Sequence, residues 1–462
     1  MKFSLGRILS LTGVVLAVTP MSVRAQDFFR DLGTSSSSGG FGPIAPSEYT
    51  YNDISPLGLE SLNSTTVQKE EQDNNFAIGP VRFSMAAGVG VELNDNITLA
   101  QTGRESDIII RPSLNIDAIW RMSDLNTLRL SIGLGYAAYM NHSQYDTQGV
   151  LISPTSELEF VFMLGNVKFT ARERGSYQED PYAVGLLSGV ARYRRYENQV
   201  GIKAEVNLNS STSVTVGYDH YNLWAVDKIF EDQTRALDTV FVKPAYGITP
   251  AIKVGLDITY SRISFESGDR PSGNAVLAGP FIEWQIGENT NFYAEGGYEG
   301  MHYDGSYRPT AFFNSASGQI SPATLAALEA APADDSNSNS YYFRLELDNK
   351  PSDVYQQRLL ASRTTEVGFF TNNYTLYHVE YAGDWSAIEK LHVTPSIFYE
   401  HYDASGALGE SANRVGVLLG FRYNLTNSIV LGLDYRYLWK TSNLPGADYY
   451  QNVLFLSAYY KF

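Results

Sequence analysis

The sequence predicts an all-β protein: a transmembrane, antiparallel, up-and-down β-barrel. Three observations predict it. Segments of about ten residues or more alternate apolar and polar side chains, whereas strands of soluble proteins average about five or six residues. Short and long connections alternate along the chain, as they do in bacterial barrels. No stretch after the N-terminal segment is apolar enough for a transmembrane helix, and a closed barrel is the other structure that pairs every backbone group inside hydrocarbon.

The N-terminal 25 residues read as a signal peptide for export. Lys2 and Arg7 provide the positive region, residues 8–18 form a short apolar run, and Val23-Arg24-Ala25 gives a cleavage site of small residues before Gln26. The apolar run is shorter than the roughly 20 residues that span a bilayer. We therefore exclude residues 1–25 from the fold.

Residues 26–80 differ in composition from the remainder of the chain. A Ser/Gly tract occupies residues 34–40, and residues 69–75 are polar. Such sequences behave as flexible chains. We expect residues 26–80 to be a flexible periplasmic extension and residues 81–462 to form the barrel.

The barrel segments begin at Val81 with a period of two. Apolar side chains recur at every second position from Val81 to Leu93, and polar or small residues stand between them. Residues 107–117 and 128–136 repeat the pattern. Because successive side chains of a strand point to opposite faces, each segment has one greasy face and one polar face.

The connections predict about 18 strands, with both ends of the barrel's chain segment on the periplasmic side. Tight turns such as Gly165-Asn166 alternate with long polar segments, the longest of which is Gly305–Ser338. An even strand number suits a single-chain barrel. The least certain pair comprises residues 341–348 and 354–364, and its loss would leave about 16 strands. At either number the interior is wide enough for water.

The closing strand carries the targeting signal. Leu454, Leu456, Ala458, Tyr460 and Phe462 share one face and end at the chain terminus. An aromatic strand with a terminal Phe resembles the sorting signal of bacterial outer-membrane barrels. It implies the barrel-assembly machinery as a partner and the outer membrane of a Gram-negative bacterium as the location, with lipid and lipopolysaccharide around the barrel.

The composition excludes several function classes. The formal net charge is -16, which argues against nucleic acid as a partner. The chain has no cysteine, so it forms no disulfide and holds no thiol nucleophile or thiolate metal site.

The polar face carries charges of both signs, which lipid contact would penalise by about 2–4 kcal/mol for each Arg or Lys near the membrane midplane. These residues are the candidate pore lining. They are Arg111, Arg129, Lys168, Arg172, Arg194, Lys203, Glu205, Lys253, Asp257, Glu283, Glu295, Arg344, Arg414, Arg422 and Arg436. The mixed sign predicts weak ion selectivity.

A local group of basic residues permits two interpretations. The group consists of Lys168, Arg172, Arg174, Arg192, Arg194 and Arg195. A basic ladder could steer anions by focusing the field. The alternative is simple pairing with neighbouring glutamates such as Glu157, Glu159 and Glu205, which is the default for buried charges.

The longest predicted loop contains a helix signal. Ser321-Pro322 begins a run of Ala and Leu that Pro332 ends. This helix could fold inward and narrow the pore, or it could form a surface lid. The adjacent Asp334-Asp335 could bind a cation, although two neighbouring acids are usually only solvated.

The sequence gives no constellation for catalysis. None of the six histidines has metal-ligand spacing, and no nucleophile elbow is present. Asp219-His220 is the nearest approach to an acid–base pair, and His220 reads more simply as an interfacial ring beside Tyr218. We predict no enzyme activity, no cofactor and no metal site.

Three short stretches resemble a known family. They are Asn94-Asp95-Asn96-Ile97 with Arg111-Pro112, Leu360-Ala361-Ser362-Arg363 with Asn372-Asn373-Tyr374, and the closing strand to Phe462. Over residues 81–462 the chain resembles the porin type 2 family of Gram-negative envelopes. The resemblance implies an outer-membrane barrel, linked in some members to extracellular polysaccharide, and it implies no catalytic residue.

The sequence thus predicts a porin-like channel for passive diffusion of small hydrophilic solutes. Two alternatives stay open: an export channel for an anionic exopolysaccharide, and a structural or adhesive surface barrel with a plugged lumen.

Overall fold

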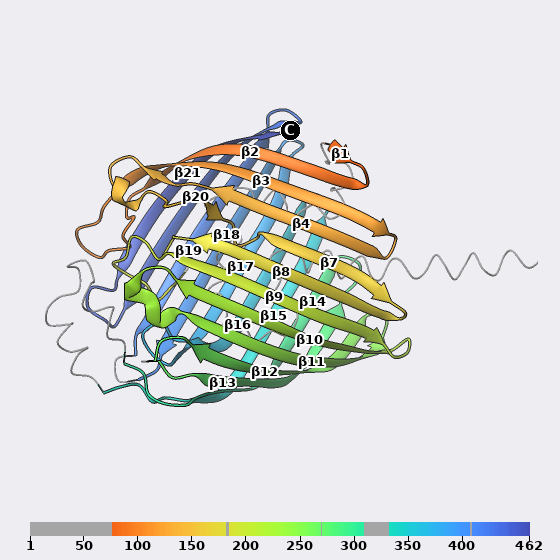
Figure 1. The fold of residues 1–462 in the computed structure, drawn as a ribbon. Coiled ribbons are helices and arrows are strands. Elements are labelled where there is room, and N and C mark those ends of the chain that lie inside the picture. The colour runs from red at the N-terminus through yellow and green to blue at the C-terminus, as the bar shows by residue number, and fades with distance from the viewer. Residues whose placement is uncertain (1–75, 182–183, 269, 309–331, 407–408) are drawn as a thin grey trace, which may run out of the picture.

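The chain folds into one closed barrel (Figure 1). The computed structural model describes residues 76–181, 184–268, 270–308, 332–406 and 409–462. They form a single antiparallel sheet of 21 strands, of which 18 make the barrel wall. Among these residues, no helix has the length and apolar character to cross a bilayer.

The wall strands are 8 to 17 residues long. They are β2 (Val81–Asn94), β3 (Asp107–Ser123), β4 (Asn126–Gly135), β7 (Glu157–Leu164), β8 (Val167–Gln178), β9 (Arg195–Asn207), β10 (Thr212–Ala225), β11 (Arg235–Thr249), β12 (Ile252–Phe265), β13 (Gly273–Gln285), β14 (Thr290–Tyr303), β15 (Ser338–Ser352), β16 (Tyr355–Val367), β17 (Asn373–Ile388), β18 (Leu391–Ala404), β19 (Ser411–Asn424), β20 (Ile429–Ser442) and β21 (Tyr449–Lys461). Three short strands, β1 (Phe76–Ile78), β5 (Ala138–Tyr139) and β6 (Leu151–Ile152), and two 3-10 helices, η1 (Ser143–Tyr145) and η2 (Lys228–Gln233), accompany them.

The barrel closes where β2 meets β21. Their ladder runs antiparallel from Ala86 opposite Lys461 to Asn94 opposite Val453. The backbone N–H of Phe462 donates to the carbonyl oxygen of Met85 at 3.0 Å. The predicted closing strand is therefore confirmed.

The strand count of 18 is confirmed and the alternative of 16 is wrong. The uncertain pair exists as β15 and β16, whose ladder runs from Phe343 opposite Arg363 to Ser352 opposite Tyr355. The expectation of an unstructured extension through residue 80 needs one correction. β1 pairs with β2, and a turn at Gly79, whose φ is 61°, joins the two strands.

Each wall strand has an outer and an inner face. On β12, Leu256 and Ile258 are 48% and 49% exposed, whereas the intervening Asp257 and Thr259 are 2% and 1% exposed. Apolar side chains thus cover the outside and polar side chains face the interior. This is the alternation that a barrel in lipid requires.

Aromatic rings mark both ends of the apolar outer face. Towards the short turns lie the exposed rings of Trp120, Trp284 and Trp385. Towards the long connections, a tyrosine hydroxyl donates to an Asp or Asn oxygen of the adjacent strand at 2.6–2.8 Å. The pairs are Tyr218–Asp238, Tyr260–Asn274, Tyr298–Asn339, Tyr399–Asn413 and Tyr435–Asn452. Such girdles sit at the two membrane interfaces. The molecule is a transmembrane β-barrel of the outer-membrane type.

Inward aromatic rings lie flat against the wall over glycines. A Cβ added at Gly416 would collide with the ring of Phe398, which is its cross-strand neighbour, and Gly217 has the same relationship with Phe241. Only glycine leaves room for a ring at these positions. The rings therefore fill space beside the wall instead of projecting towards the barrel axis.

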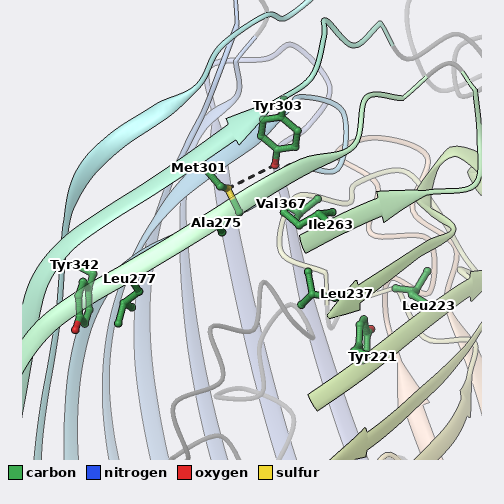
Figure 2. Packing of buried hydrophobic residues seen from close by; sticks show 10 residues of the cluster. All are labelled: Tyr221, Leu223, Leu237, Ile263, Ala275, Leu277, Met301, Tyr303, Tyr342 and Val367. Atoms are coloured by element: carbon green, nitrogen blue, oxygen red, sulfur yellow. Dashed lines mark hydrogen bonds between the residues drawn. The ribbon is translucent and has the colours of Figure 1, made fainter. Parts of the chain in front are cut away.

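Close to the long connections, the inner face of β10–β16 carries a cluster of buried apolar side chains, beside buried polar ones such as Glu299 and Thr365. Figure 2 shows the cluster, in which Leu223, Ile263 and Met301 are at most 1% exposed. The hydroxyl of Tyr303 contacts the Met301 sulfur at 3.5 Å. The expected wet inner face is thus interrupted by a dry layer at this end of the barrel.

Candidate functional site

The predicted pore-lining residues lie on the inner side of the barrel wall, except for one that lies in a connection between strands. All except Arg194 lie in wall strands, on the face opposite the apolar outer one. Arg194 lies in the connection between β8 and β9, where its guanidinium Nε donates to Asp227 Oδ1 at 3.0 Å. A role for these residues in passing solute stays a prediction.

On β4, β7, β8 and β9, most interior ion pairs are accessible to water, whereas the pair of Arg195 and Glu197 is only 3% and 10% exposed. Arg129 Nη1 lies 3.5 Å from Glu159 Oε1, and their side chains are 39% and 26% exposed. Arg174 Nη2 lies 3.3 Å from Glu157 Oε2 with exposures of 21% and 24%. Both pairs line this side of the interior, which is therefore hydrated.

The remaining predicted residues also have polar partners. The contacts are Arg111 with Glu92 at 2.6 Å, Lys168 and Lys203 with Glu205 at 3.7 and 3.0 Å, Arg172 with Asp219 at 3.4 Å, Lys253 with Glu283 at 3.3 Å, Asp257 with Lys243 at 2.5 Å, Glu295 with Tyr342 at 2.8 Å, Arg344 with Glu346 at 2.6 Å, Arg414 with Glu400 at 2.6 Å, Arg422 with Asp434 at 2.6 Å and Arg436 with Gln451 at 3.3 Å. Charge pairing is thus the common state of the interior.

The basic group follows the pairing interpretation for the most part. Arg172 and Arg174 lie beside carboxylates, and Arg195 Nε lies 2.6 Å from Glu197 Oε1. Arg192 instead donates to the backbone carbonyl of Asp146 at 3.3 Å. These residues therefore do not form a continuous row of uncompensated cations.

Two ion pairs on β18–β20 are dry. Arg414 and Glu400 are each 1% exposed, and Arg422 and Asp434 are 5% and 2% exposed. Buried charges persist only when they are paired and hydrogen-bonded, so this wall is built for structure rather than for contact with solute. The two walls of the interior differ in hydration.

A segment that the sequence analysis missed covers the dry wall. Residues 179–181 follow β8, and residues 184–194 lie against the opposite side of the barrel and lead into β9. Lys440, on β20, donates from Nζ to the Leu186 carbonyl oxygen at 3.2 Å, and the N–H of Gly189 donates to the Leu99 carbonyl oxygen at 3.0 Å. We name residues 179–181 and 184–194 the crossing segment.

Apolar packing holds the crossing segment in place. Val184, Leu186 and Leu187 cluster with Tyr374 of β17 and Tyr402 of β18. The ring of Phe230, from η2, contacts Tyr193 and Phe369 edge-on, with centroids 4.8 and 5.8 Å away. The one available signal was the set of apolar residues after Pro181 in an otherwise polar loop.

Titrating groups secure the base of the crossing segment. The hydroxyl of Tyr177 donates to Glu179 Oε1 at 2.7 Å. Burial raises the pKa of the Glu179 carboxyl above its ordinary value. The hydrogen bond to Asp227 raises the pKa of the Arg194 guanidinium. These ties fix both ends of the segment.

Arg270 joins the long connections to one another. Its guanidinium donates to Gln233 Oε1 at 3.0 Å and to the Thr371 carbonyl oxygen at 3.2 Å, and it stacks on the ring of Tyr307 at 4.5 Å. Burial lowers the pKa of Arg270. One side chain thus links three connections at the outer end of the barrel.

The two acidic residues at positions 334 and 335 have different environments: the first is buried and hydrogen-bonded, and the second faces solvent. Asp334 is 7% exposed and accepts hydrogen bonds from the Asn372 N–H at 2.7 Å and the Ser405 hydroxyl at 2.5 Å, whereas Asp335 is exposed. In the described ranges no group of His, Asp and Glu could hold a metal ion. The predicted helix at 321–330 lies outside the described residues.

Asp219 and His220 cannot act as a pair. Asp219 points inward to Arg172, whereas His220 lies on the outer face with Nδ1 2.8 Å from Asp238 Oδ1. Adjacent strand residues face opposite sides of the wall. The interfacial position expected for His220 is confirmed.

Comparisons with known proteins return outer-membrane barrels. The chain is similar to the outer-membrane protein opdK of Pseudomonas aeruginosa, with 11% identity, a TM-score of 0.44 and coverage of 83% of this chain and 99% of that chain. OccAB1 of Acinetobacter baumannii gives 10% identity, a TM-score of 0.43 and coverage of 85% and 99%. OccK2 (OpdF) of Pseudomonas aeruginosa in complex with glucuronate gives 10% identity, a TM-score of 0.44 and coverage of 83% of this chain and 98% of that chain.

No family model matches the chain, and none of the curated proteins matches it. Identities and TM-scores of this size do not establish function, which must be argued from the residues of this chain. The outer-membrane barrel that the resemblance to the porin type 2 family implies is confirmed by the closed 18-stranded wall.

Proposed function

We propose that the protein is an outer-membrane channel through which small hydrophilic solutes diffuse passively. The observation that carries the proposal is the hydrated wall of β4 and β7–β9. Its side chains are charged yet 16–39% exposed inside a barrel whose outside is apolar. Exposure of this extent requires water in the interior, and water on the inside of a membrane barrel offers a path for polar solutes.

The crossing segment confines that path to one side of the barrel interior. It occupies the side of β17–β20 and leaves the hydrated wall uncovered. A passage restricted to one side of the interior suits small solutes. It speaks against the export of a bulky polysaccharide.

A plugged structural barrel is the second candidate. The crossing segment and the apolar layer of Figure 2 favour it, because both fill the interior towards the long connections. This candidate predicts a barrel that is stable and correctly inserted but electrically silent.

Conductance of the full-length mature protein in planar bilayers separates the two candidates. We expect stepwise, steady ion currents with weak selectivity between K⁺ and Cl⁻. Liposome swelling should show entry of small sugars and exclusion of larger oligosaccharides. Heat-modifiable migration on gels verifies folding, and folded protein without current in repeated reconstitutions would overturn the channel.

A further inference from the structure

We propose that β1 sets the register in which the barrel closes, because it occupies the part of the β2 edge onto which β21 could otherwise slide. The inference goes beyond the proposed channel and concerns assembly, so it holds for an open barrel and for a plugged one. The strand, Phe76–Ile78, lies beside the beginning of β2 and precedes the first wall strand (Figure 1).

β1 and β21 lie end to end on one edge of β2. The other edge of β2 is filled by β3 along its whole length. β21 pairs with β2 residues 86–94, and β1 pairs with β2 residues 81–83. The backbone N–H of Phe462 extends the pairing of β21 to the Met85 carbonyl oxygen. Only Ser84 therefore separates the two pairings on this edge.

The seam between β2 and β21 has no connection that sets its register. Each other pairing of wall strands joins two strands that follow each other in the chain. In a hairpin, the turn type and loop length fix the register. A shift of one residue would turn the apolar side chains inward, but a shift of two residues keeps every side chain on its face. Slippage by two residues is therefore the competing closure that this barrel must exclude.

Side chains hold the seam at its end near the long connections. The N–H and the side-chain amide of Asn452 donate to the two carboxylate oxygens of Asp95 at 2.7 and 2.8 Å. The side-chain amide of Gln451 donates to the Asn96 carbonyl oxygen at 2.8 Å. These contacts belong to the observed register. At the end near the short turns, β1 takes over this role.

β1 blocks the shift of β21 towards the short turns. A shift of two residues would move Phe462 from its place opposite Met85 to a place opposite Phe83. Phe76 holds that place, and its ring stacks on that of Phe83 with centroids 5.3 Å apart and an interplanar angle of 9°. Gly79, with a φ of 61°, provides the tight turn that keeps β1 against β2. Because two strands cannot occupy the same edge, β1 must leave before β21 can move.

The direction of the backbone groups shows which residues attach β1 to β2. Met85 accepts the hydrogen bond of Phe462 at 3.0 Å, so the odd-numbered residues of β2 direct their backbone groups to this edge. Phe76 and Ile78 lie opposite odd-numbered residues, and their N–H groups therefore point to β2. The N–H of Ala77 points away from β2.

The test compares two engineered disulfides in a chain that has no cysteine of its own. Val89→Cys/Ala458→Cys joins direct neighbours in the observed register, whereas Ala87→Cys/Ala458→Cys joins residues that become neighbours after the shift. The Cα atoms of direct neighbours in a hydrogen-bonded pair lie about 5.5 Å apart, within reach of a disulfide, and those of residues offset by two positions do not. Non-reducing gels measure both yields after copper-catalysed oxidation of the full-length mature protein refolded in detergent.

Phe76→Pro/Ile78→Pro removes the N–H groups that attach β1 to β2. In this background, the yield of the Ala87→Cys/Ala458→Cys disulfide should rise roughly fivefold, as expected when pairing hydrogen bonds are lost, and that of the other disulfide should fall. Ala77→Pro is the matched control, because an edge strand tolerates proline where the N–H points outward. Both yields should stay as they are in the chain with an unsubstituted β1.

Heat-modifiable migration verifies that each variant is folded. Folded Phe76→Pro/Ile78→Pro protein with the same two yields as Ala77→Pro would overturn the proposal. If the double variant does not fold, Phe76→Ala, which removes the ring stacked on Phe83, is compared with Ala77→Pro under the same two expectations. The conductance assay tests the channel separately, so the failure of one proposal leaves the other standing.

Discussion

Lys440 Nζ donates a hydrogen bond to the backbone carbonyl oxygen of Leu186 at 3.2 Å and also lies 2.8 Å from Glu410 Oε1. The lysine is fully buried, and it joins the crossing segment to the wall at β20. Burial of a charge is tolerated when partners surround it. Lys440 is therefore the main polar anchor of the crossing segment on this side of the barrel.

Substitution Lys440→Met should release the crossing segment. It removes the donor to Leu186 and leaves Glu410 without its cation, a loss of about 3–5 kcal/mol for a buried pair. We expect a larger and noisier single-channel conductance and faster proteolysis between residues 184 and 194. Lys350→Met serves as the control, because Lys350 pairs with the exposed Asp353. Equal conductance in both variants would show that Lys440 does not hold the segment.

A charge placed on the outer face should oppose membrane insertion. Leu256 is 48% exposed and lies on β12 between the two aromatic girdles. Leu256→Arg should lower the free energy of unfolding in lipid by about 2–4 kcal/mol. Leu256→Met keeps the site apolar and should stay within about 1.5 kcal/mol of the original. Urea titration in phosphatidylcholine vesicles measures both, and equal midpoints would mean that Leu256 does not face lipid.

The ring of Phe398 should resist a methyl group at Gly416. Gly416→Ala forces the ring away from the wall, and overpacking of this kind costs about 1–3 kcal/mol. Gly175→Ala is the matched control, because a Cβ there would meet only the side chain of Asn198 at 4.0 Å. The temperature at which the folded band disappears on semi-native gels should fall for the first variant only.

Glu179 should make stability depend on pH. Burial raises its pKa, so the folded chain binds this proton more tightly than the unfolded chain. The stabilisation is complete below the unfolded value of about 4.3 and is lost as pH rises through the folded pKa. Glu179→Gln keeps an acceptor for Tyr177 and should raise the urea midpoint near neutral pH while flattening its decline with pH. Glu231→Gln, at an exposed position, should leave the profile unchanged; identical profiles for both variants would contradict the assignment to Glu179.

The wall of the barrel was readable from the sequence because lipid imposes a period of two on every strand. The apolar Leu256 and the acidic Asp257 indicate by their chemistry which face of the strand each occupies. The crossing segment was not readable, because Leu187 packs near Tyr374 and Tyr402, which are distant in the sequence. The sequence also could not show that the Glu205 carboxylate lies near both Lys168 and Lys203, because that depends on the register of β8 against β9.

The seam between β2 and β21 joins the first and last wall strands of the chain. Until Phe462 has emerged, β2 presents an open edge that can template pairing with another molecule. Contacts of such long sequence separation also form slowly. A chain that stops within β21 leaves this edge of β2 unpaired, so we expect it to aggregate instead of closing a smaller barrel.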